Sequence, residues 1–533
     1  MNNIRSLYCF LMLLLSFSAV AVPTDYLVLK WSKQLGLVSE FHQVVELTNN
    51  PYLLDEKPEK LAVKLMGKDG TEKWLPIEKS QFTRAEFHGE GSVDGRQILN
   101  EEVVFVVRVE KNWVDQLILP ARLAQKSMQS YSWNILLASA SNTGTQLVSE
   151  KLSERKSNQD NRVNLLFMGD GYTGAQQTDY NHDVDEVIAY MQTFEPYLSY
   201  KNFLSYDRLF VASNQSGADK PAPCFNPAVS RDTAFDGKYC TNGIDRLVTV
   251  NASKILAAAA ASPNWDEIVV IVNDSRYGGS GGYFSTISTN EFAADVFVHE
   301  YGHTFTDLAD EYDSPYPGYP ACSDVNGPIC DVNVTDETNR NAIKWSYLIE
   351  PSTPIPTPET SLYDGVVGLF EGARYQEFNM YRSQNKCNMQ SLGAAFCKVC
   401  QEAYVLKLYS VNYSGGQLLS LIEPNSMVPS QSNMTGMVAV SMNFSVDTMQ
   451  PNHGLSVTWL VNDVPHSVEI NTDNQQSFQL IPNQVGLSSI KVRIKDNSPF
   501  VHLTRIDELP EFEFEWVVDV LPFEDLIFAA GFE

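Results

Sequence analysis

Residues 293–312 read AADVFVHEYGHTFTDLADEY, and this stretch decides how the middle of the chain is interpreted. An apolar helical face precedes two histidines, His299 and His303, which are four residues apart. Because residues at this spacing project from one face of an α-helix, both imidazoles can bind a single metal ion. Glu300 follows the first histidine and is expected to deprotonate water activated by that metal. The stretch therefore predicts a buried helix that carries a catalytic zinc site.

The specificity of this pattern comes from the scarcity of histidine. The chain has 8 histidines among 533 residues, so only about 0.01 matches to H-E-x-x-H are expected by chance. Two surface histidines on an ordinary helix are the alternative. Gly302 between the histidines is expected to leave room for close packing.

A catalytic zinc ion uses three protein ligands and leaves its fourth position to water. No histidine occurs between His303 and His453, so a carboxylate is expected as the third ligand. On a straight helix Asp307 would lie about 12 Å along the axis from His299. A turn directly after His303 would instead return Asp310 to the site. A solvated acidic turn remains the alternative for Asp307 and Glu311.

Several short motifs together resemble the bacterial IgA-peptidase family of secreted zinc metallopeptidases. The resemblance covers roughly residues 160–405 and rests on HEYGHTFTDLADEY at 299–312, GDGYT at 169–173, SGAD at 216–219, DTAF at 232–235, YGGSGG at 277–282, GLFEGA at 368–373, CNM at 387–389 and FCKVC at 396–400. It implies a mixed α/β, metzincin-like layout with Met389 in a turn beneath the zinc. It also implies Asp310 as the third ligand, seven residues after His303, whereas metzincins place theirs at six.

Other candidate residues lie near these motifs. Tyr381, with Arg382 beside it, is a candidate donor to the oxyanion of the transition state, with packing or a surface ion pair as the alternative. The glycine run 277–282 either lets a substrate backbone approach or forms a plain surface loop. The segment 169–172 lacks a phosphate-binding spacing and is interpreted as a structural turn.

Composition and periodicity divide the rest of the chain. Short alternating runs in residues 22–140 predict a β-sandwich, and the polar stretch 141–160 is interpreted as a linker. Residues 161–412 are expected to form the catalytic domain. There, strands expected at 163–168, 209–212 and 268–272 alternate with helices expected at about 179–197 and 255–261, which is typical of a mixed α/β fold with parallel pairing.

The C-terminal third changes pattern again. Alternating runs at 455–461, 490–494 and 512–520 predict a second, immunoglobulin-like β-sandwich over 418–522, followed by a tail at 523–533. The fold class expected for the whole chain is therefore multidomain, with a mixed α/β metzincin-like zinc peptidase domain between two β-sandwiches.

The first 21 residues are typical of a signal peptide, with a short basic start, an apolar run and a small-x-small site at 19–21. The mature protein is expected to be secreted, either extracellular or periplasmic, with no membrane span. A net charge of −27 argues against nucleic acid as a partner and is compatible with further cations such as structural Ca²⁺.

The seven cysteines after the signal peptide are expected to form disulfides in an oxidising compartment. Cys224 with Cys240 and Cys322 with Cys330 are the expected pairs. Among Cys387, Cys397 and Cys400 only one bridge can form, which leaves one thiol. A zinc knuckle is the alternative there, but no fourth ligand lies nearby in the sequence.

The sequence predicts a secreted enzyme, an endopeptidase with one catalytic Zn²⁺ bound by His299, His303 and Asp310. Glu300 is the expected general base, and a protein or peptide is the expected substrate. Two alternatives stay open: a zinc-stabilised adhesin or glycan-binding protein without catalysis, and a zinc hydrolase acting on a cell-wall or glycan substrate. The sequence does not indicate an oligomeric state.

Overall fold

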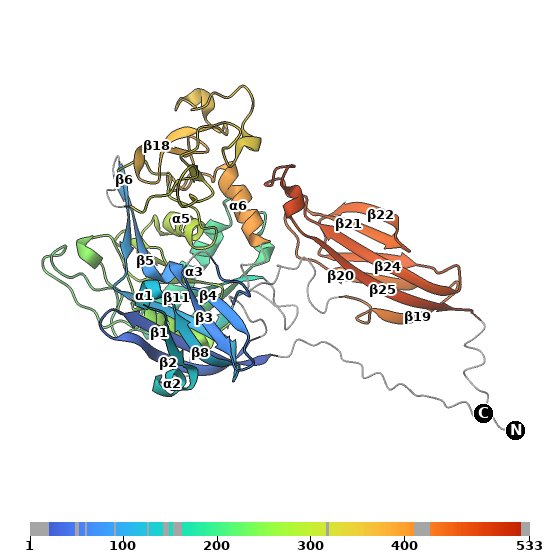
Figure 1. Cartoon of the computed structure of the whole chain (residues 1–533), viewed down its shortest axis with the longest axis horizontal. Coiled ribbons are helices and arrows are strands. Elements are labelled where there is room, and N and C mark those ends of the chain that lie inside the picture. Colours follow the sequence, from blue (N-terminus) through green and yellow to red (C-terminus); the bar gives the residue numbers. More distant parts are fainter. Residues whose placement is uncertain are drawn as a thin grey trace.

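A computed structural model describes residues 21–47, 53–58, 61–89, 92–124, 127–141, 149–152, 162–315, 319–409 and 427–523. The expected signal peptide at 1–21, the linker at 141–160 and the tail at 523–533 fall wholly or mostly outside these ranges. The described chain is a mixed, sheet-rich, multidomain structure (Figure 1). None of its described helices is both long enough and apolar enough to cross a membrane.

The N-terminal part consists of two small sheets and a projecting hairpin. The first sheet has the order β2-β1-β7, the second β4-β3-β8-β9, and the hairpin is β5-β6. The strands are β1 (Val22–Ser32), β2 (Gly36–Leu47), β3 (Ala62–Gly67), β4 (Glu72–Pro76), β5 (Phe82–Gly89), β6 (Ser92–Leu99), β7 (Glu102–Glu110), β8 (Val114–Leu119) and β9 (Gln129–Ser132), with helices α1 (Ala121–Ala124) and α2 (Trp133–Ser139).

The sheet β2-β1-β7 is buried on both faces. Leu27 and Phe105 point into the core shared with the second sheet, whereas Tyr26 and Val106 join a core with α4 (Ala252–Ala258) and the central sheet. This double burial explains why β7 is a nearly continuous apolar run rather than an alternating one.

The central part is built on a six-stranded sheet of order β10-β12-β11-β13-β15-β14, in which the inner strands β12, β11, β13 and β15 are parallel. The edge strands β10 and β14 are antiparallel to their neighbours. The strands are β10 (Glu150–Lys151), β11 (Val163–Asp170), β12 (Leu204–Leu209), β13 (Glu267–Val272), β14 (Gly279–Ser280) and β15 (Ser285–Ser288).

Helices cover both faces of this sheet. α3 (Gln177–Met191) and α5 (Ala293–Thr304) pack on one face, through residues such as Val184 and Phe297 against Phe167. α4 packs on the other face. The chain after α5 forms β16 (Val334–Thr335), β17 (Phe370–Ala373), β18 (Gln376–Arg382) and α6 (Lys398–Leu408).

The C-terminal part has two sheets, of orders β19-β25-β24-β21-β22 and β20-β23. Phe444, Trp459 and Trp516 are among the residues that fill the space between them. The strands are β19 (Asn433–Met437), β20 (Met442–Asp447), β21 (Leu455–Val461), β22 (Val464–Asn471), β23 (Gln475–Leu480), β24 (Gly486–Lys495) and β25 (Glu511–Leu521).

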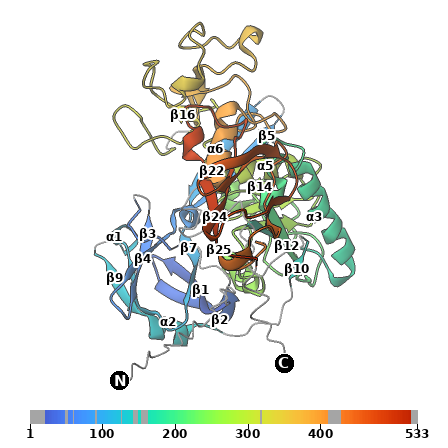
Figure 2. The ribbon, with the colours of Figure 1, turned by 90° about the vertical axis from the view of Figure 1, so that its right-hand side faces the viewer.

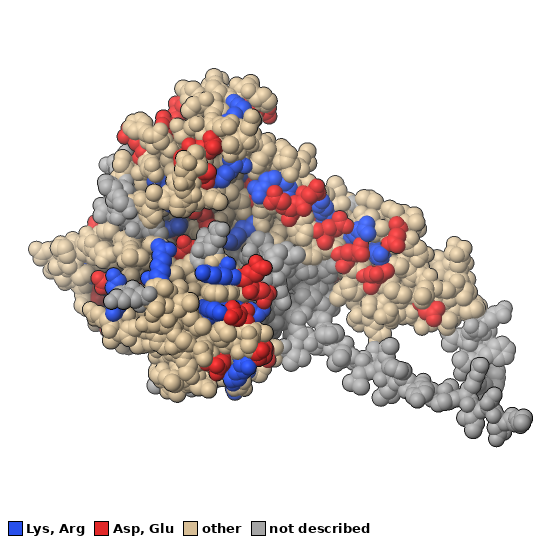
Figure 3. Space-filling view, in the orientation of Figure 1, with Lys and Arg blue, Asp and Glu red and all other residues tan. Residues whose placement is uncertain are grey.

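This part packs against the central part near α6 (Figures 1 and 2). The Asp496 carboxylate accepts hydrogen bonds from the hydroxyls of Tyr200 and Tyr409, at 2.6 and 2.9 Å. Glu402 on α6 forms an ion pair with Arg505 at 3.1 Å. On the face in Figure 3, acidic and basic side chains are interspersed rather than gathered by sign.

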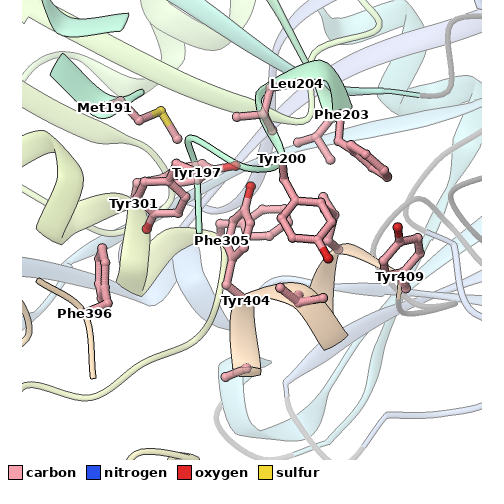
Figure 4. Packing of buried hydrophobic residues seen from close by; sticks show 14 of the residues in the cluster. Met191, Tyr197, Tyr200, Phe203, Leu204, Tyr301, Phe305, Phe396, Tyr404 and Tyr409 are labelled. Carbon is pink, nitrogen blue, oxygen red and sulfur yellow. The ribbon is translucent and has the colours of Figure 1, made fainter. Parts of the chain in front are cut away.

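Aromatic rings join α5 to α6 and to the loop after α3. The ring centroid of Tyr197 lies 5.5 Å from Tyr301, 5.4 Å from Phe396 and 4.8 Å from Tyr404 (Figure 4). Phe305 stacks on Tyr301 at 5.2 Å. These ring contacts, most of them edge-to-face, hold α5 in place on the side that carries Tyr301. The opposite side of the helix, which carries the two histidines, is held in place as well.

Candidate metal centre

The second half of α5 carries the two histidines, and all its residues from Val296 to Thr304 are buried. The Nε2 atoms of His299 and His303 are 3.1 Å apart. Both imidazoles therefore point to one place, as the four-residue spacing predicts.

The chain reverses directly after the helix. Asp307 adopts a left-handed backbone conformation with φ of 58°, and the Leu308 N–H donates to the carbonyl of Gly302 at 3.2 Å. A left-handed residue of this kind commonly follows the end of a helix, although glycine is more common at that position. Lys407 binds the Asp307 carboxylate at 2.9 Å and Lys79 lies 3.5 Å from it. The turn brings Asp310 back to the histidines.

Asp310 completes a group of three ligand atoms. Its Oδ1 lies 3.2 Å from Nε2 of His299 and 3.1 Å from Nε2 of His303. Ligands about 2.0–2.1 Å from a tetrahedral zinc ion would stand about 3.3 Å apart, so the three atoms fit one shared ion. All three side chains are at most 3% exposed. Burial alone would raise the pKa of Asp310, but the two imidazoles hold it well below its usual range.

Outer hydrogen bonds fix the orientation of each candidate ligand. Nδ1 of His299 lies 2.9 Å from the carbonyl oxygen of Asn388, and Nδ1 of His303 lies 2.6 Å from that of Leu308. Since a carbonyl only accepts, each Nδ1 carries the proton and each Nε2 offers a lone pair that can bind a metal ion. Oδ2 of Asp310 accepts a hydrogen bond from the Tyr375 hydroxyl at 2.6 Å, which leaves Oδ1 for the ion.

Glu300 lies beside this group and is fully buried. A Cβ at Gly281 would stand 1.8 Å from its Oε2, so the glycine makes room for the carboxylate. The residues Gly278–Gly281 are buried, which contradicts a plain surface loop. The glycine run therefore accommodates the protein's own glutamate at this point.

Arg84 on β5 reaches the site from the N-terminal part. Its backbone pairs with Gly281 through hydrogen bonds of 2.8 and 3.0 Å. Burial acts to lower the pKa of Arg84, but Tyr319 and Asp310 raise it above its ordinary value, so the guanidinium stays charged. No sequence signal marked this residue, because its partners lie in a different part of the chain.

Gly302 also has a packing role. A Cβ there would lie 2.9 Å from the sulfur of Met389, which is fully buried against this side of α5. The room expected at Gly302 is thus taken up by Met389.

Tyr381 and Arg382 lie on β18. Among the described residues no hydrogen bond joins Tyr381 to the three candidate ligands, and the donor role expected for it stays a prediction. The Arg382 guanidinium donates to the carbonyls of Glu371 and Gly372 and to the Glu359 carboxylate, so it has a structural role. Tyr375, which sequence reasoning missed, provides the hydroxyl that contacts Asp310.

The segment 169–172 is a structural turn, as expected. The Asp170 carboxylate accepts from the backbone N–H groups of Phe235 and Gly237, at 2.7 and 2.8 Å, and from the Thr233 hydroxyl at 2.9 Å. Burial raises the pKa of Asp170 above its usual value despite these bonds. Asp170 thereby connects the motif at 169–173 to the motif at 232–235.

The solvated acidic turn is the wrong interpretation for Glu311. Its side chain is fully buried and its Oε1 accepts a hydrogen bond from Asn333 at 2.9 Å. Burial raises the pKa of Glu311 well above its usual range. Asp307, by contrast, keeps a third of its side chain exposed.

Two imidazoles and one carboxylate converge beside the buried carboxylate of Glu300, and this arrangement can hold a metal ion. The family model described as IgA Peptidase M64 matches residues 152–364 and 359–407. This central segment of the chain is similar to the IgA peptidase M64 family, whose members are metal-dependent peptidases. The resemblance noted in the sequence is confirmed.

Other comparisons add little. No curated protein matches the chain. Among solved structures, a Bacteroides uniformis β-glucuronidase is 10% identical, with 94% of this chain and 60% of that chain covered and a TM-score of 0.15. An FMN-binding β-glucuronidase from Facaelibacterium prausnitzii L2-6 is 7% identical over 94% of this chain and 87% of that one, with a TM-score of 0.14. The chain spans about 60% of the first structure's length.

Proposed function

We propose that the protein is an exported, zinc-dependent endopeptidase in which Glu300 is the general base. The observation that carries the proposal is the convergence of His299, His303 and Asp310 within 3.2 Å of one another. Two imidazole nitrogens and one carboxylate oxygen form a donor set that suits zinc and leaves one position for water.

When bound, zinc supplies a Lewis acid that acidifies water and polarises the scissile carbonyl. The protein's own residues do the rest. Glu300, adjacent to His299 on α5, accepts the proton of the attacking water and passes it to the leaving amine. Asn388 and Leu308 hold the imidazoles in the required tautomer through their carbonyls, and Tyr375 holds Asp310.

Export is part of the proposal and rests on the sequence of the first 21 residues. Two disulfides, Cys224–Cys240 and Cys322–Cys330, support an oxidising compartment. Both are the pairs expected from the sequence.

A peptide-library digestion by the mature protein tests the proposal. Three samples are compared: the protein as purified, the protein stripped with a chelator, and the stripped protein after zinc is restored. We expect cleavage in the first and third samples only. Zinc-loaded protein that cleaves no peptide would favour a catalytically silent adhesin. Cleavage confined to peptidoglycan or glycan substrates would favour the other hydrolase.

A further inference from the structure

A second group of buried metal-binding side chains lies behind the first. It consists of Cys387, Cys397, Cys400 and Glu311, each at most 2% exposed. Cys397 is the N-cap of α6 and Cys400 lies in its first turn. Glu311 directly follows Asp310 in the chain. The group is therefore closed to solvent, and it joins Glu311 to the distant segment 387–400.

The separations between the ligand atoms are compatible with a tetrahedral metal site. All four atoms lie within 4.8 Å of one another. The sulfurs of Cys387 and Cys400 are 3.7 Å apart, and the Cys400 sulfur is 3.7 Å from Oε1 of Glu311. With zinc–sulfur bonds of about 2.3 Å and a zinc–oxygen bond of about 2.0 Å, tetrahedral geometry places two sulfurs about 3.8 Å apart and a sulfur and an oxygen about 3.5 Å apart.

Neighbouring donors are arranged as they are around metal-bound thiolates. The Cys397 N–H points to the sulfur of Cys387 at 3.3 Å, and the Cys400 N–H to that of Cys397 at 3.3 Å. The Ser383 hydroxyl also donates to the Cys397 sulfur, at 3.2 Å. Such donors orient ligands and offset their negative charge.

Glu311 supplies an independent observation. Its Oε2 is fully buried and has no hydrogen-bond partner among the described residues. An unsatisfied carboxylate oxygen in the protein interior is costly, and a cation beside it removes that cost.

We propose that Cys387, Cys397, Cys400 and Glu311 bind a second zinc ion, which is structural. Four protein ligands with no access for water are the mark of a structural site, whereas a catalytic site keeps one position open. Glu311 is the fourth ligand that the spacing of the cysteines alone did not reveal. The three cysteines form no bridge in the structure, in contrast to the two expected pairs.

The second ion would stabilise the catalytic centre. Glu311 adjoins Asp310, and its N–H donates to the carbonyl of Met389 at 2.8 Å. Cys387 is next to Asn388, whose carbonyl orients His299. Binding one ion to Glu311, Cys387 and α6 therefore fixes both the loop that carries Asp310 and the turn that supports α5.

Metal analysis of purified variants tests this assignment without any need for turnover. We expect about two zinc ions per wild-type chain and about one in His303→Ala, in Glu311→Gln and in Cys400→Ser. Lys398→Ala is the matched control, because Lys398 is exposed on α6 between two of the cysteines. It should keep both ions. A wild-type chain that holds one zinc ion, lost in His303→Ala, would overturn the proposal and leave the proposed peptidase intact.

A second measurement does not depend on whether a variant folds. Wild-type protein is unfolded in a chelator without reductant and alkylated, and the modified cysteines are identified by mass spectrometry. We expect alkylation at Cys387, Cys397 and Cys400 and none at the four disulfide cysteines. Cobalt-substituted protein should also show sulfur-to-cobalt charge-transfer absorption. A disulfide between any two of the three cysteines would refute the second site. A spectrum of the cobalt-substituted protein that lacks the sulfur-to-cobalt charge-transfer band would refute it as well.

Discussion

Gly281 and Glu300 are in direct contact: a Cβ at position 281 would stand 1.8 Å from Oε2 of the glutamate. Gly281 belongs to the segment that pairs with Arg84 of β5, and Glu300 belongs to α5. The position of the proposed general base thus depends on how closely a loop at the sheet edge approaches the helix.

Gly281→Ala should displace the Glu300 carboxylate and lower kcat by about tenfold or more, because a general base must stay within hydrogen-bond reach of its water. Zinc content should be unchanged, since neither residue is a proposed ligand. Overpacking should also cost about 1–3 kcal/mol of unfolding free energy. Gly174→Ala is the control, because a Cβ there meets nothing within 4 Å. Normal turnover in Gly281→Ala would show that the loop shifts instead and leaves the Glu300 carboxylate in place.

Glu300→Gln should keep zinc and lose peptidase activity by about 10²–10⁴-fold, because it removes the base without removing a ligand. Metal content and turnover are measured on the same preparation. Near-wild-type turnover would rule out the proposed role of Glu300.

Tyr375→Phe should weaken zinc binding at the catalytic site by about 10–100-fold, since the hydroxyl that orients Asp310 is lost. Competition with a chromophoric chelator gives the affinity. Tyr381→Phe is a useful comparison: we expect unchanged zinc affinity, and a fall in kcat alone would support the predicted oxyanion donor. Equal zinc affinity in Tyr375→Phe and wild type would contradict the role given to Tyr375.

Reduction should destabilise the central part first, because both disulfides lie there. The bridges close loops with sequence separations of 16 and 8. Chain-entropy arguments assign them about 3 and about 2.5 kcal/mol. Limited proteolysis with and without reductant should show new cuts between residues 162 and 409 only. Early cuts in the N-terminal sheets would contradict this.

Local patterns predicted much of the fold and part of the site. The helix with His299, Glu300 and His303 follows from four-residue spacing, and the strands at 163–168 and 268–272 correspond to β11 and β13. The strand expected at 209–212 was wrong in position. β12 runs through Leu204–Leu209 because Asp207 and Arg208, which look like loop residues, are paired with Ser262 and Glu150.

The missed residues all act across tertiary contacts. Tyr375, Arg84 and the carbonyl of Asn388 reach the site from other segments, and nothing in their local sequence marks them. A solvated turn stays open for Glu311 on sequence alone, because the cysteines beside it lie far along the chain. Periodicity reports which face of an element is buried, but it does not report which distant side chain that face meets.

The last prediction concerns Asp310. The family resemblance implies that it is the third ligand, although it lies seven residues after His303 and metzincins place theirs at six. Asp310→Ala should lower zinc affinity at the catalytic site by about a hundredfold or more, because a ligand and the partner of Tyr375 are both lost. Asp307→Asn is the matched control. It removes a charge from the same turn, and asparagine tolerates the left-handed backbone at φ of 58°.

Loss of the Lys407 and Lys79 contacts in Asp307→Asn should cost at most about 1 kcal/mol of stability and leave zinc bound. Both variants are dialysed against a weak chelator, and their zinc is compared with that of wild type. Because the proposed second ion is held by other residues, Asp310→Ala should keep about one zinc ion per chain. Two zinc ions retained in Asp310→Ala would show that another carboxylate completes the catalytic site. Equal loss in Asp307→Asn would show that the turn itself, rather than the Asp310 carboxylate, determines binding.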